Sequence, residues 1–430
     1  MSRPLARVFK STVQRALFCL EQFARHEMAN HAAAGAYAFL LSALPALLVI
    51  LYLASLAAGA FALDADGILR LLGPYLDAFG GRQALAPLLS RPIAGFAGAF
   101  GLINLIWAAR LFIVSIQRGI RVVYSGSASI NPVRENALTF ILELIMLLAA
   151  ISLLAVGQAL RAAQAGIAWA PMKAVFGWLV SAGLFMLPAI VLWLFVYGTY
   201  LNVPPKRPAK RHALVSSLLC IALYLGISAF VGIFIDTERY GLLYGILGNL
   251  IAGLIKVYSF FWFYFFFAEL CYTLEYYDSL LFARFHRLDT AEKTPNALER
   301  GLFAKPQRLF RRYAKDYRSG QAIFCKGQKG DEAYYLYKGS VAIYLDDPAS
   351  GATPVSRVGE GEFFGEMASI LKESRSAWAL AEAEATVFVL PAAMFERILS
   401  QDPEASRRLV NIMASRLLAN NDLMRGGDGA

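Results

Sequence analysis

The sequence predicts an N-terminal all-α bundle of about six membrane-spanning helices, followed by a C-terminal β jelly-roll barrel with flanking helices. Three observations lead to this two-part architecture. Hydrophobic residues make up 58% of the 430 residues and charged residues only 17%, which is too apolar for a purely water-soluble chain. Several runs of about 20 apolar residues are long enough to cross a bilayer. After residue 316, short alternating strands are separated by glycine-containing turns.

The first segment, residues 1–31, places basic side chains among apolar ones at helical spacing. This pattern predicts an amphipathic helix that lies on the anionic cytoplasmic leaflet of a membrane. The basic positions are Arg3, Arg7, Lys10, Arg15 and Arg25, and the apolar ones include Leu5, Val8, Phe9, Val13, Leu17 and Leu20.

A transmembrane domain is predicted over residues 32–275. Its apolar runs fall near 32–62, 95–117, 137–160, 174–201, 213–235 and 243–273. The loops near 118–136 and 203–212 are basic, whereas those near 63–92 and 236–241 carry aspartate or glutamate. Cytoplasmic loops collect Lys and Arg, so this alternation predicts a multi-pass protein of a bacterial-type inner (plasma) membrane with both termini in the cytoplasm. The net charge of +10 is then assigned to cytoplasmic loops rather than to nucleic-acid binding.

Charged residues inside the predicted spans are candidates for a membrane pathway. An unpaired charge in hydrocarbon is costly, so such residues face a bundle interior or a wet cavity. The alternative is that Arg110 pairs with Glu143, or Lys256 with Glu269, only to lock helices together. The candidate pathway residues are Arg110, Glu143, Lys256 and Glu269.

A basic helical connector is expected over 276–316, packed either on the barrel or on the membrane face. The barrel domain is assigned to 317–425, with strands at 335–337 and 341–344 around the turn at Gly339. From Pro391 onward the apolar residues change to helical spacing, which predicts terminal helices.

The segment FFGEMA at 363–368, followed by RSAW at 375–378, has the side chains that a cyclised phosphate and a ribose require. Gly365 lets the backbone approach a ligand closely, and the amides that follow it open a helical turn that attracts an anion. Glu366 can accept a hydrogen bond from a ribose hydroxyl, and Arg375 offers a fork of donors to two phosphate oxygens. Arg375 has no acidic neighbour in the sequence, so an external anion is its expected partner. The predicted ligand-binding residues are Phe364, Gly365, Glu366, Met367, Ala368, Arg375, Ser376 and Ala377.

This segment resembles the phosphate-binding cassette of cyclic nucleotide-binding domains, the module of bacterial catabolite activators and of regulatory subunits of cyclic-nucleotide-dependent kinases. The resemblance covers roughly residues 300–425 and includes glycines 320, 327, 330 and 339 upstream. It implies a regulatory cyclic nucleotide over which the terminal helices close. Trp378 stands where cyclic-GMP-selective members often carry a threonine, so cyclic AMP is favoured over cyclic GMP. The alternatives are an ordinary barrel with a structural arginine and a degenerate cassette that binds nothing.

The apolar part resembles the YihY/BrkB family of inner-membrane proteins over about residues 20–280. The resemblance rests on AAGAY at 33–37, LPALL at 44–48, YGLLYG at 240–245, AEL at 268–270, and the segments 107–121 and 131–134. That family was once labelled ribonuclease BN. This sequence departs from its pattern at Lys256, inside the last span, and in its fused C-terminal domain.

Neither metal nor covalent chemistry is predicted. His26 and His31 lie five apart beside Glu27, a poor match to the HExxH spacing of zinc enzymes, and no HxHxDH run is present. Cysteines 19, 220, 271 and 325 are scattered without CxxC spacing, which predicts reduced structural thiols. No catalytic residue, metal or cofactor is therefore expected, and the chain is not expected to be an enzyme.

The combined prediction is an integral membrane transporter or permease of unknown substrate, regulated by a cyclic nucleotide. A non-transporting membrane scaffold or envelope protein with a nucleotide-sensing domain is the first alternative. A membrane-associated ribonuclease is the second. The expected partners are the cyclic nucleotide, the lipid bilayer and, as an open option, further copies of the chain. DNA binding is not expected, because only a few residues follow the predicted terminal helices.

Overall fold

The computed structural model describes residues 3–42, 111–124, 169–234, 246–289 and 297–401, together with isolated helical positions between and after them. The chain divides into two compact units, Arg15–Glu275 and the combination of Met1–Gln14 with Tyr276–Ala430. The division therefore falls within α1 (Arg3–Arg25) and directly after α10 (Ile246–Glu275).

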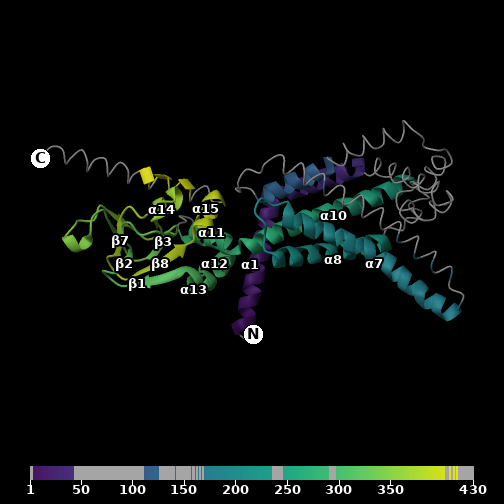
Figure 1. The fold of residues 1–430 in the computed structure, drawn as a ribbon, viewed down its shortest axis with the longest axis horizontal. Helices are drawn as coiled ribbons and strands as arrows, with labels where there is room; N and C mark the ends of the chain where they lie inside the picture. Colours follow the sequence, from purple (N-terminus) through teal and green to yellow (C-terminus); the bar gives the residue numbers. More distant parts are fainter. Residues whose placement is uncertain are drawn as a thin grey trace. The chain divides into compact units, whose positions relative to one another are not determined.

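The unit Arg15–Glu275 is helical in its described part, with α7 (Ala170–Asn202), α8 (Lys210–Phe234) and α10 packed side by side (Figure 1). Among the described residues, two stretches are long and apolar enough to cross a bilayer, Lys210–Val231 and Gly253–Glu275, and a shorter apolar helix covers Met186–Asn202. These helices coincide with the predicted runs 174–201, 213–235 and 243–273. The runs 95–117 and 137–160 lie largely outside the described residues, as does about two thirds of the run 32–62, so a bundle of about six spans stays a prediction.

Close contacts between helices hold this unit together. The Tyr200 hydroxyl on α7 donates to the Tyr264 carbonyl on α10 at 2.6 Å, and Trp193 Nε1 donates to Ser217 Oγ on α8 at 3.1 Å. Gly119, in the helix 111–123, lies so near the Phe265 ring that an added Cβ would come within 2.2 Å of it. Small residues at helix contacts allow this close backbone approach.

The amphipathic N-terminal segment differs from its prediction in extent and in what covers its apolar face. α1 ends at Arg25, a turn at His26 and Glu27 follows, and a second helix occupies 28–42. Phe23 packs on Trp262 and Phe266 of α10, with ring centroids 4.9 and 5.7 Å apart. Phe23, near the end of α1, therefore contacts protein side chains, whereas Phe9 and Leu20 of the predicted apolar face remain exposed.

The second unit contains a barrel of two four-stranded antiparallel sheets, with strand orders β1-β8-β3-β6 and β2-β7-β4-β5. The strands are β1 (Ala314–Tyr317), β2 (Ala322–Phe324), β3 (Ala333–Lys338), β4 (Val341–Tyr344), β5 (Ser356–Val358), β6 (Phe363–Phe364), β7 (Trp378–Ala381) and β8 (Ala385–Leu390). The predicted strands at 335–337 and 341–344 are confirmed as β3 and β4. The barrel begins at Ala314, three residues before its predicted start, because β1 pairs along its whole length with β8.

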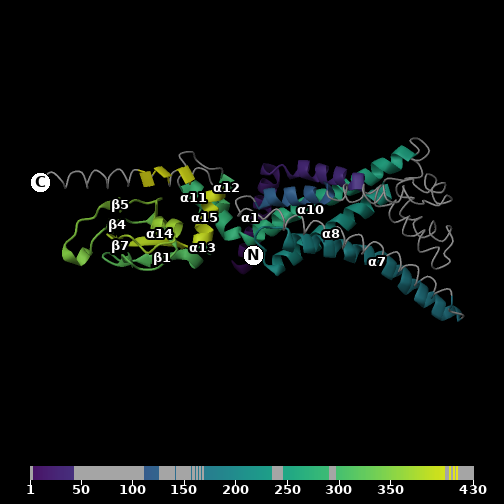
Figure 2. The ribbon, with the colours of Figure 1, turned by 45° about the horizontal axis from the view of Figure 1, so that its top comes forward.

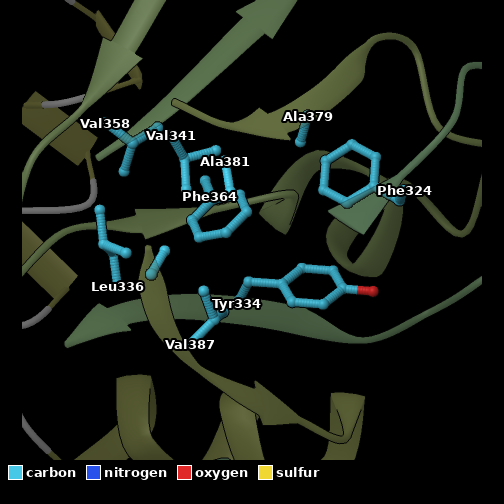
Figure 3. Packing of buried hydrophobic residues seen from close by; sticks show 10 residues of the cluster. Phe324, Tyr334, Leu336, Val341, Val358, Phe364, Ala379, Ala381 and Val387 are labelled. Carbon is cyan, nitrogen blue, oxygen red and sulfur yellow. The ribbon is translucent and has the colours of Figure 1, made fainter. Parts of the chain in front are cut away.

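The barrel core lies between the two sheets, where apolar side chains from both pack together (Figure 3). Tyr334 and Leu336 of β3 face this core. Tyr335, between them, points to the opposite face of the sheet and contacts helices there. Residues 333–336 are consequently all buried, which a strand shows only when both of its faces are covered.

The helices that cover this outer face come from the predicted connector: α11 (Tyr277–Asp289), α12 (Ala297–Phe303) and α13 (Gln307–Tyr313). Figures 1 and 2 show them beside the strands, together with α15 (Ala392–Gln401). Phe282 of α11 packs its ring against Tyr335 at 5.4 Å and Phe388 at 5.6 Å. Of the two predicted placements of the connector, the structure shows packing on the barrel.

Candidate functional site

The cassette predicted at 363–368 starts on strand β6 and turns at Gly365 into the short helix α14 (Glu366–Leu371). Gly365 has φ 67°, in the left-handed region. A Cβ there would lie 2.9 Å from the Tyr334 ring and 3.0 Å from Arg375 Nη1. Glycine is therefore required twice over, for the backbone conformation and for the space.

Arg375 brings the cassette and the β2–β3 region together. Its Nη1 donates to the Gly365 carbonyl at 2.6 Å, and its Nη2 donates to the Glu332 carbonyl at 2.9 Å and to Glu332 Oε2 at 3.4 Å. A guanidinium carries five N–H donors, so these three bonds leave donor capacity for a further acceptor. The arginine side chain is 2% exposed, which places this charge inside the domain.

Aromatic rings and backbone bonds fix the Arg375 position. The guanidinium carbon lies 4.6 Å from the Phe324 ring centroid and 5.1 Å from that of Tyr334. Cations over aromatic faces are stabilised by the ring quadrupole. The backbone of Arg375 is tied to the β2–β3 loop, because its N–H donates to the Gln328 carbonyl at 3.0 Å. Burial raises the pKa of the Tyr334 phenol above its ordinary value, while Arg375 opposes that shift.

The sequence predicted an external anion as the partner of Arg375, but the structure shows that the Glu332 carboxylate is also a partner. The carboxylate lies 43 positions upstream in the sequence and reaches Arg375 through the barrel fold. It follows Gly330 and Asp331, which belong to the recognised glycine pattern, but nothing in that pattern shows that the next side chain turns toward the cassette. Glu332 is 42% exposed, so it is an accessible counter-ion and not a sealed one.

The other predicted ligand-binding residues differ in their exposure. Phe364 is fully buried in the barrel core, and Glu366 and Ala368 are also buried. Met367 and Ser376 are exposed, and Ala377 is half-buried. A carboxylate at the start of α14 and a guanidinium fastened to Gly365, the residue before it, provide an acceptor for hydroxyls and a donor fork for an anion.

The structure describes two of the four predicted membrane-pathway residues, Glu269 and Lys256. Glu269 is completely buried and contacts His26, whose Nδ1 lies 2.6 Å from Glu269 Oε1. Lys256 is half-buried on the same helix. Thirteen residues of α-helix extend about 20 Å, so Lys256 cannot pair with Glu269, and that alternative is wrong. Arg110 and Glu143 lie outside the described residues. The sequence did not predict His26 as the partner of Glu269.

Thiols and metal ligands show no site in the described part of the chain. Cys19, Cys220 and Cys271 are buried and Cys325 is half-buried, all as free thiols. Among the described residues, no three or more His, Cys, Asp or Glu side chains gather as a metal site would require.

Comparison with known families agrees with this geometry. A family model for the cyclic nucleotide-binding domain matches residues 314–402, which span the barrel from β1 to the end of α15. The chain thus carries a cyclic nucleotide-binding domain at its C-terminal side. A model named virulence factor BrkB matches residues 19–285, more than half of the chain. The chain belongs to the BrkB family of membrane proteins, here fused to a cyclic nucleotide-binding domain.

Three individual relatives each match about a quarter of the chain. Glutaminase 1 of Bradyrhizobium diazoefficiens is 37% identical over 111 residues, which are 25% of this chain and 17% of the relative. The cAMP-activated global transcriptional regulator CRP of Salmonella typhimurium is 29% identical over 107 residues, 25% of this chain and 51% of the relative. The crystal structure of the Thermus thermophilus catabolite activator protein is 24% identical, with a TM-score of 0.23, over 26% of this chain and 53% of that one. The chain spans about half the length, or less, of these proteins.

Proposed function

We propose that this protein is a multi-pass inner-membrane transporter or permease whose activity is set by cyclic AMP bound at its C-terminal domain. The observation that carries the proposal is the Arg375 arrangement. A buried guanidinium donates one hydrogen bond to the Gly365 carbonyl and two to Glu332, and it has N–H donors beyond these three bonds. Glu366, the residue after Gly365, is buried at the start of α14. The proposal puts both termini in the cytoplasm, where the nucleotide is available.

Cyclic AMP is preferred over cyclic GMP on two grounds. Trp378 follows Arg375 and Ser376 at the position where a threonine hydroxyl in the resembling family contacts guanine. An indole has one N–H donor and no hydroxyl, so it cannot replace that contact. One of the matching relatives is named as cAMP-activated.

The binding step is tested by calorimetric titration of the full-length protein in detergent with cyclic AMP and with cyclic GMP. Arg375→Gln removes the cationic fork and is expected to weaken cyclic AMP binding at least about 100-fold, because a lost charged hydrogen-bond partner costs about 1.5–3 kcal/mol per bond. Arg357→Gln is the matched control, since that arginine lies on β5 with its side chain 68% exposed and pairs with Glu382. Equal affinities in the three proteins would overturn the proposed site.

Transport is proposed because charged residues occur inside apolar helices, where an ion or solute pathway is their usual role. Reconstituted protein should show solute flux that changes on adding cyclic AMP, and the Arg375→Gln variant should lose this response. Lys256→Ala and Glu269→Ala should reduce the flux itself. Flux that survives both changes would remove the support for a pathway.

The same preparations separate the alternatives. A membrane scaffold or envelope protein would bind the nucleotide and carry no flux for any solute in a broad panel. A membrane-associated ribonuclease would cleave RNA, with activity lost on adding a chelator if a metal ion is required.

A further inference from the structure

The described part of the unit Arg15–Glu275 contains two histidine–glutamate pairs, and their environments differ sharply. In the first, His26 Nδ1 lies 2.6 Å from Glu269 Oε1, with the carboxylate side chain fully buried and the imidazole 16% exposed. In the second, His212 Nδ1 lies 2.8 Å from Glu275 Oε2, with side chains 20% and 25% exposed. Both glutamates lie on α10, within one unit, so each pair serves as a control for the other.

The hydrogen bonding of the two carboxylates also differs. Glu275 Oε2 accepts a second bond from the Ala209 backbone N–H at 2.8 Å, as a structural cap does. Glu269 Oε2 has no hydrogen-bond partner among the described residues, although it is buried. A buried charge that lacks partners is costly, so a purely structural pair in this position would gain stability by filling the vacant acceptor.

Other buried oxygens on the same two helices lack partners as well. Thr273 lies four residues after Glu269 on α10, and Gln22 lies four residues before His26 on the chain. Within the described part of the chain, Thr273 Oγ1 and Gln22 Oε1 are buried without a hydrogen-bond partner. Residues four apart share a helix face, so Thr273 lies on the same face of α10 as Glu269. Gln22 lies one turn before His26, whose backbone N–H donates to the Gln22 carbonyl at 2.9 Å. Such groups are usually satisfied by ordered water, which also conducts protons.

The backbone at the pair is held in an uncommon conformation. Glu27, the residue after His26, has φ 52° in the turn between α1 and the helix 28–42. Its carboxylate accepts a bond from Asn30 Nδ2 at 3.0 Å. Left-handed conformations of residues other than glycine are rare, and they cluster at sites where the position of a neighbouring group matters.

We propose that His26 and Glu269 form a proton-binding site inside the membrane unit. In the unloaded state, neutral His26 donates through Nδ1–H to ionised Glu269, and the pair carries one negative charge. One added proton makes the pair neutral overall, either as imidazolium with carboxylate or as imidazole with carboxylic acid. A buried apolar site favours the neutral pair, and the vacant Oε2 leaves room for a proton to arrive or leave.

The surrounding charges come from each packed element. On α1, Cys19 and Arg25 interact electrostatically with Glu269. His31, on the helix 28–42, interacts with His26 and with Glu27. Arg118 and Arg121 of the helix 111–123 are exposed. Among these described groups Arg25 is the nearby cation. Its charge lowers the electrostatic cost of the negatively charged pair, but it forms no direct contact with Glu269.

The site is tested by infrared difference spectroscopy of the full-length protein in lipid nanodiscs, titrated between about pH 5 and pH 8, the range in which histidine exchanges protons. The wild type should show the gain of one proton in carboxyl and imidazole bands. Glu269→Gln should remove the carboxyl part of this signal and reduce its imidazole part to that of the other histidines, and His26→Gln should remove the His26 contribution to the imidazole bands. The matched control Glu275→Gln should leave it unchanged.

The infrared spectra of these variants test the proposed proton-binding site. A signal that is unchanged in Glu269→Gln, or the absence of a carboxyl signal in the wild type across the range, would overturn it. If Glu269→Gln does not fold, as judged by circular dichroism, the His26→Gln spectrum supplies the same decision. A role of this proton in driving solute flux rests on the proposed transport function. Solute flux that does not depend on pH, in a protein that also lacks the infrared signal of Glu269, would refute the proton site alone. The infrared signal in a protein that shows no solute flux would refute transport alone.

Discussion

At the scale of single residues, Arg375 determines the character of the C-terminal site. Its guanidinium contacts the Gly365 carbonyl, the Glu332 carbonyl and the rings of Phe324 and Tyr334. These contacts place the charge before any ligand arrives, so that binding does not have to order a free side chain. The counter-ion Glu332, whose Oε2 lies 3.4 Å from Arg375 Nη2, distinguishes this arrangement from a site in which an external anion is the partner of the arginine.

Replacing Glu332 by glutamine should strengthen cyclic nucleotide binding by up to about fivefold. The carboxylate competes with a phosphate for Arg375, and an accessible ion pair is worth only about 0.2–1 kcal/mol. Glutamine keeps the side-chain size and leaves the backbone carbonyl bond in place. Calorimetric titration measures the change, and weaker binding in the variant would show that Glu332 assists the ligand instead.

Replacing Gly365 by alanine should weaken nucleotide binding and destabilise the barrel. The left-handed backbone costs about 1–2 kcal/mol for a residue with a Cβ, and the new methyl group meets Tyr334, Phe324 and Arg375 at about 3 Å. Gly351→Ala is the matched control, because Gly351 has φ 82° and an added methyl group there meets no described atom within 4 Å. Titration and thermal unfolding of both variants separate the steric effect at the cassette from backbone strain alone.

At the scale of elements, α11 acts as part of the barrel. Phe282 and Phe285 fill the outer face of the β1-β8-β3-β6 sheet, and the Tyr335 hydroxyl donates to Asp289 at 2.7 Å. Asp278 accepts bonds from Arg312 and Tyr313 of α13 at 2.9 and 3.2 Å. His286 and Phe282 also contact Phe363, the residue two before Gly365. A rearrangement at the cassette therefore reaches α11 through a single side chain.

Truncating Phe282 to alanine should destabilise the barrel by about 3–5 kcal/mol, the usual cost of removing a buried aromatic ring. Hydrogen exchange of strands β3 and β8 in the full-length protein measures this effect, because their protection reports local opening. Leu345→Ala, at a position 38% exposed in the same unit, is the control and should change little. Unchanged protection in Phe282→Ala would mean that α11 is not part of the folded barrel.

At the scale of the whole molecule, the chain passes between the two units within α1 and again between Glu275 and Tyr276. In the C-terminal unit, the first part of α1 is attached to the connector. Lys10 Nζ donates to the Gly301 carbonyl at 2.8 Å, and Gln14 Nε2 donates to the Leu302 carbonyl at 2.7 Å. The Tyr277 hydroxyl donates to Gln14 Oε1 at 2.5 Å. Gln14 thus joins α1 to both α11 and α12.

Replacing Gln14 by alanine should leave nucleotide affinity unchanged while reducing any effect of the nucleotide on the membrane unit. The variant loses both bonds of the amide, so α12 should exchange its amide hydrogens faster. Hydrogen exchange of residues 297–303 and nucleotide titration, carried out on one preparation, measure the two effects. Phe9→Ala, 63% exposed on the same helix, is the control. A loss of affinity equal to that of Arg375→Gln would contradict a role limited to communication.

Much of this protein follows from local sequence pattern. The long apolar runs predicted α7, α8 and α10, and alternation with glycine turns predicted β3 and β4, because helices and strands impose periods of 3.6 and 2 on side chains. The spacing of Gly365, Glu366 and Arg375 was sufficient to predict the cassette, since its parts lie within about a dozen residues. The basic and acidic loops led to an orientation prediction without any tertiary information.

Only the tertiary structure decided which distant groups meet. Glu332 reaches Arg375 across 43 positions, and His26 reaches Glu269 across 243. The sequence predicted a lipid-binding surface on α1, and the structure packs Phe23, near the end of this helix, against α10. A helical period shows that a face must be buried but does not specify its partner, because burial of apolar surface is non-directional. Pairings of this kind arise only when the complete chain brings specific side chains within a few ångströms of one another.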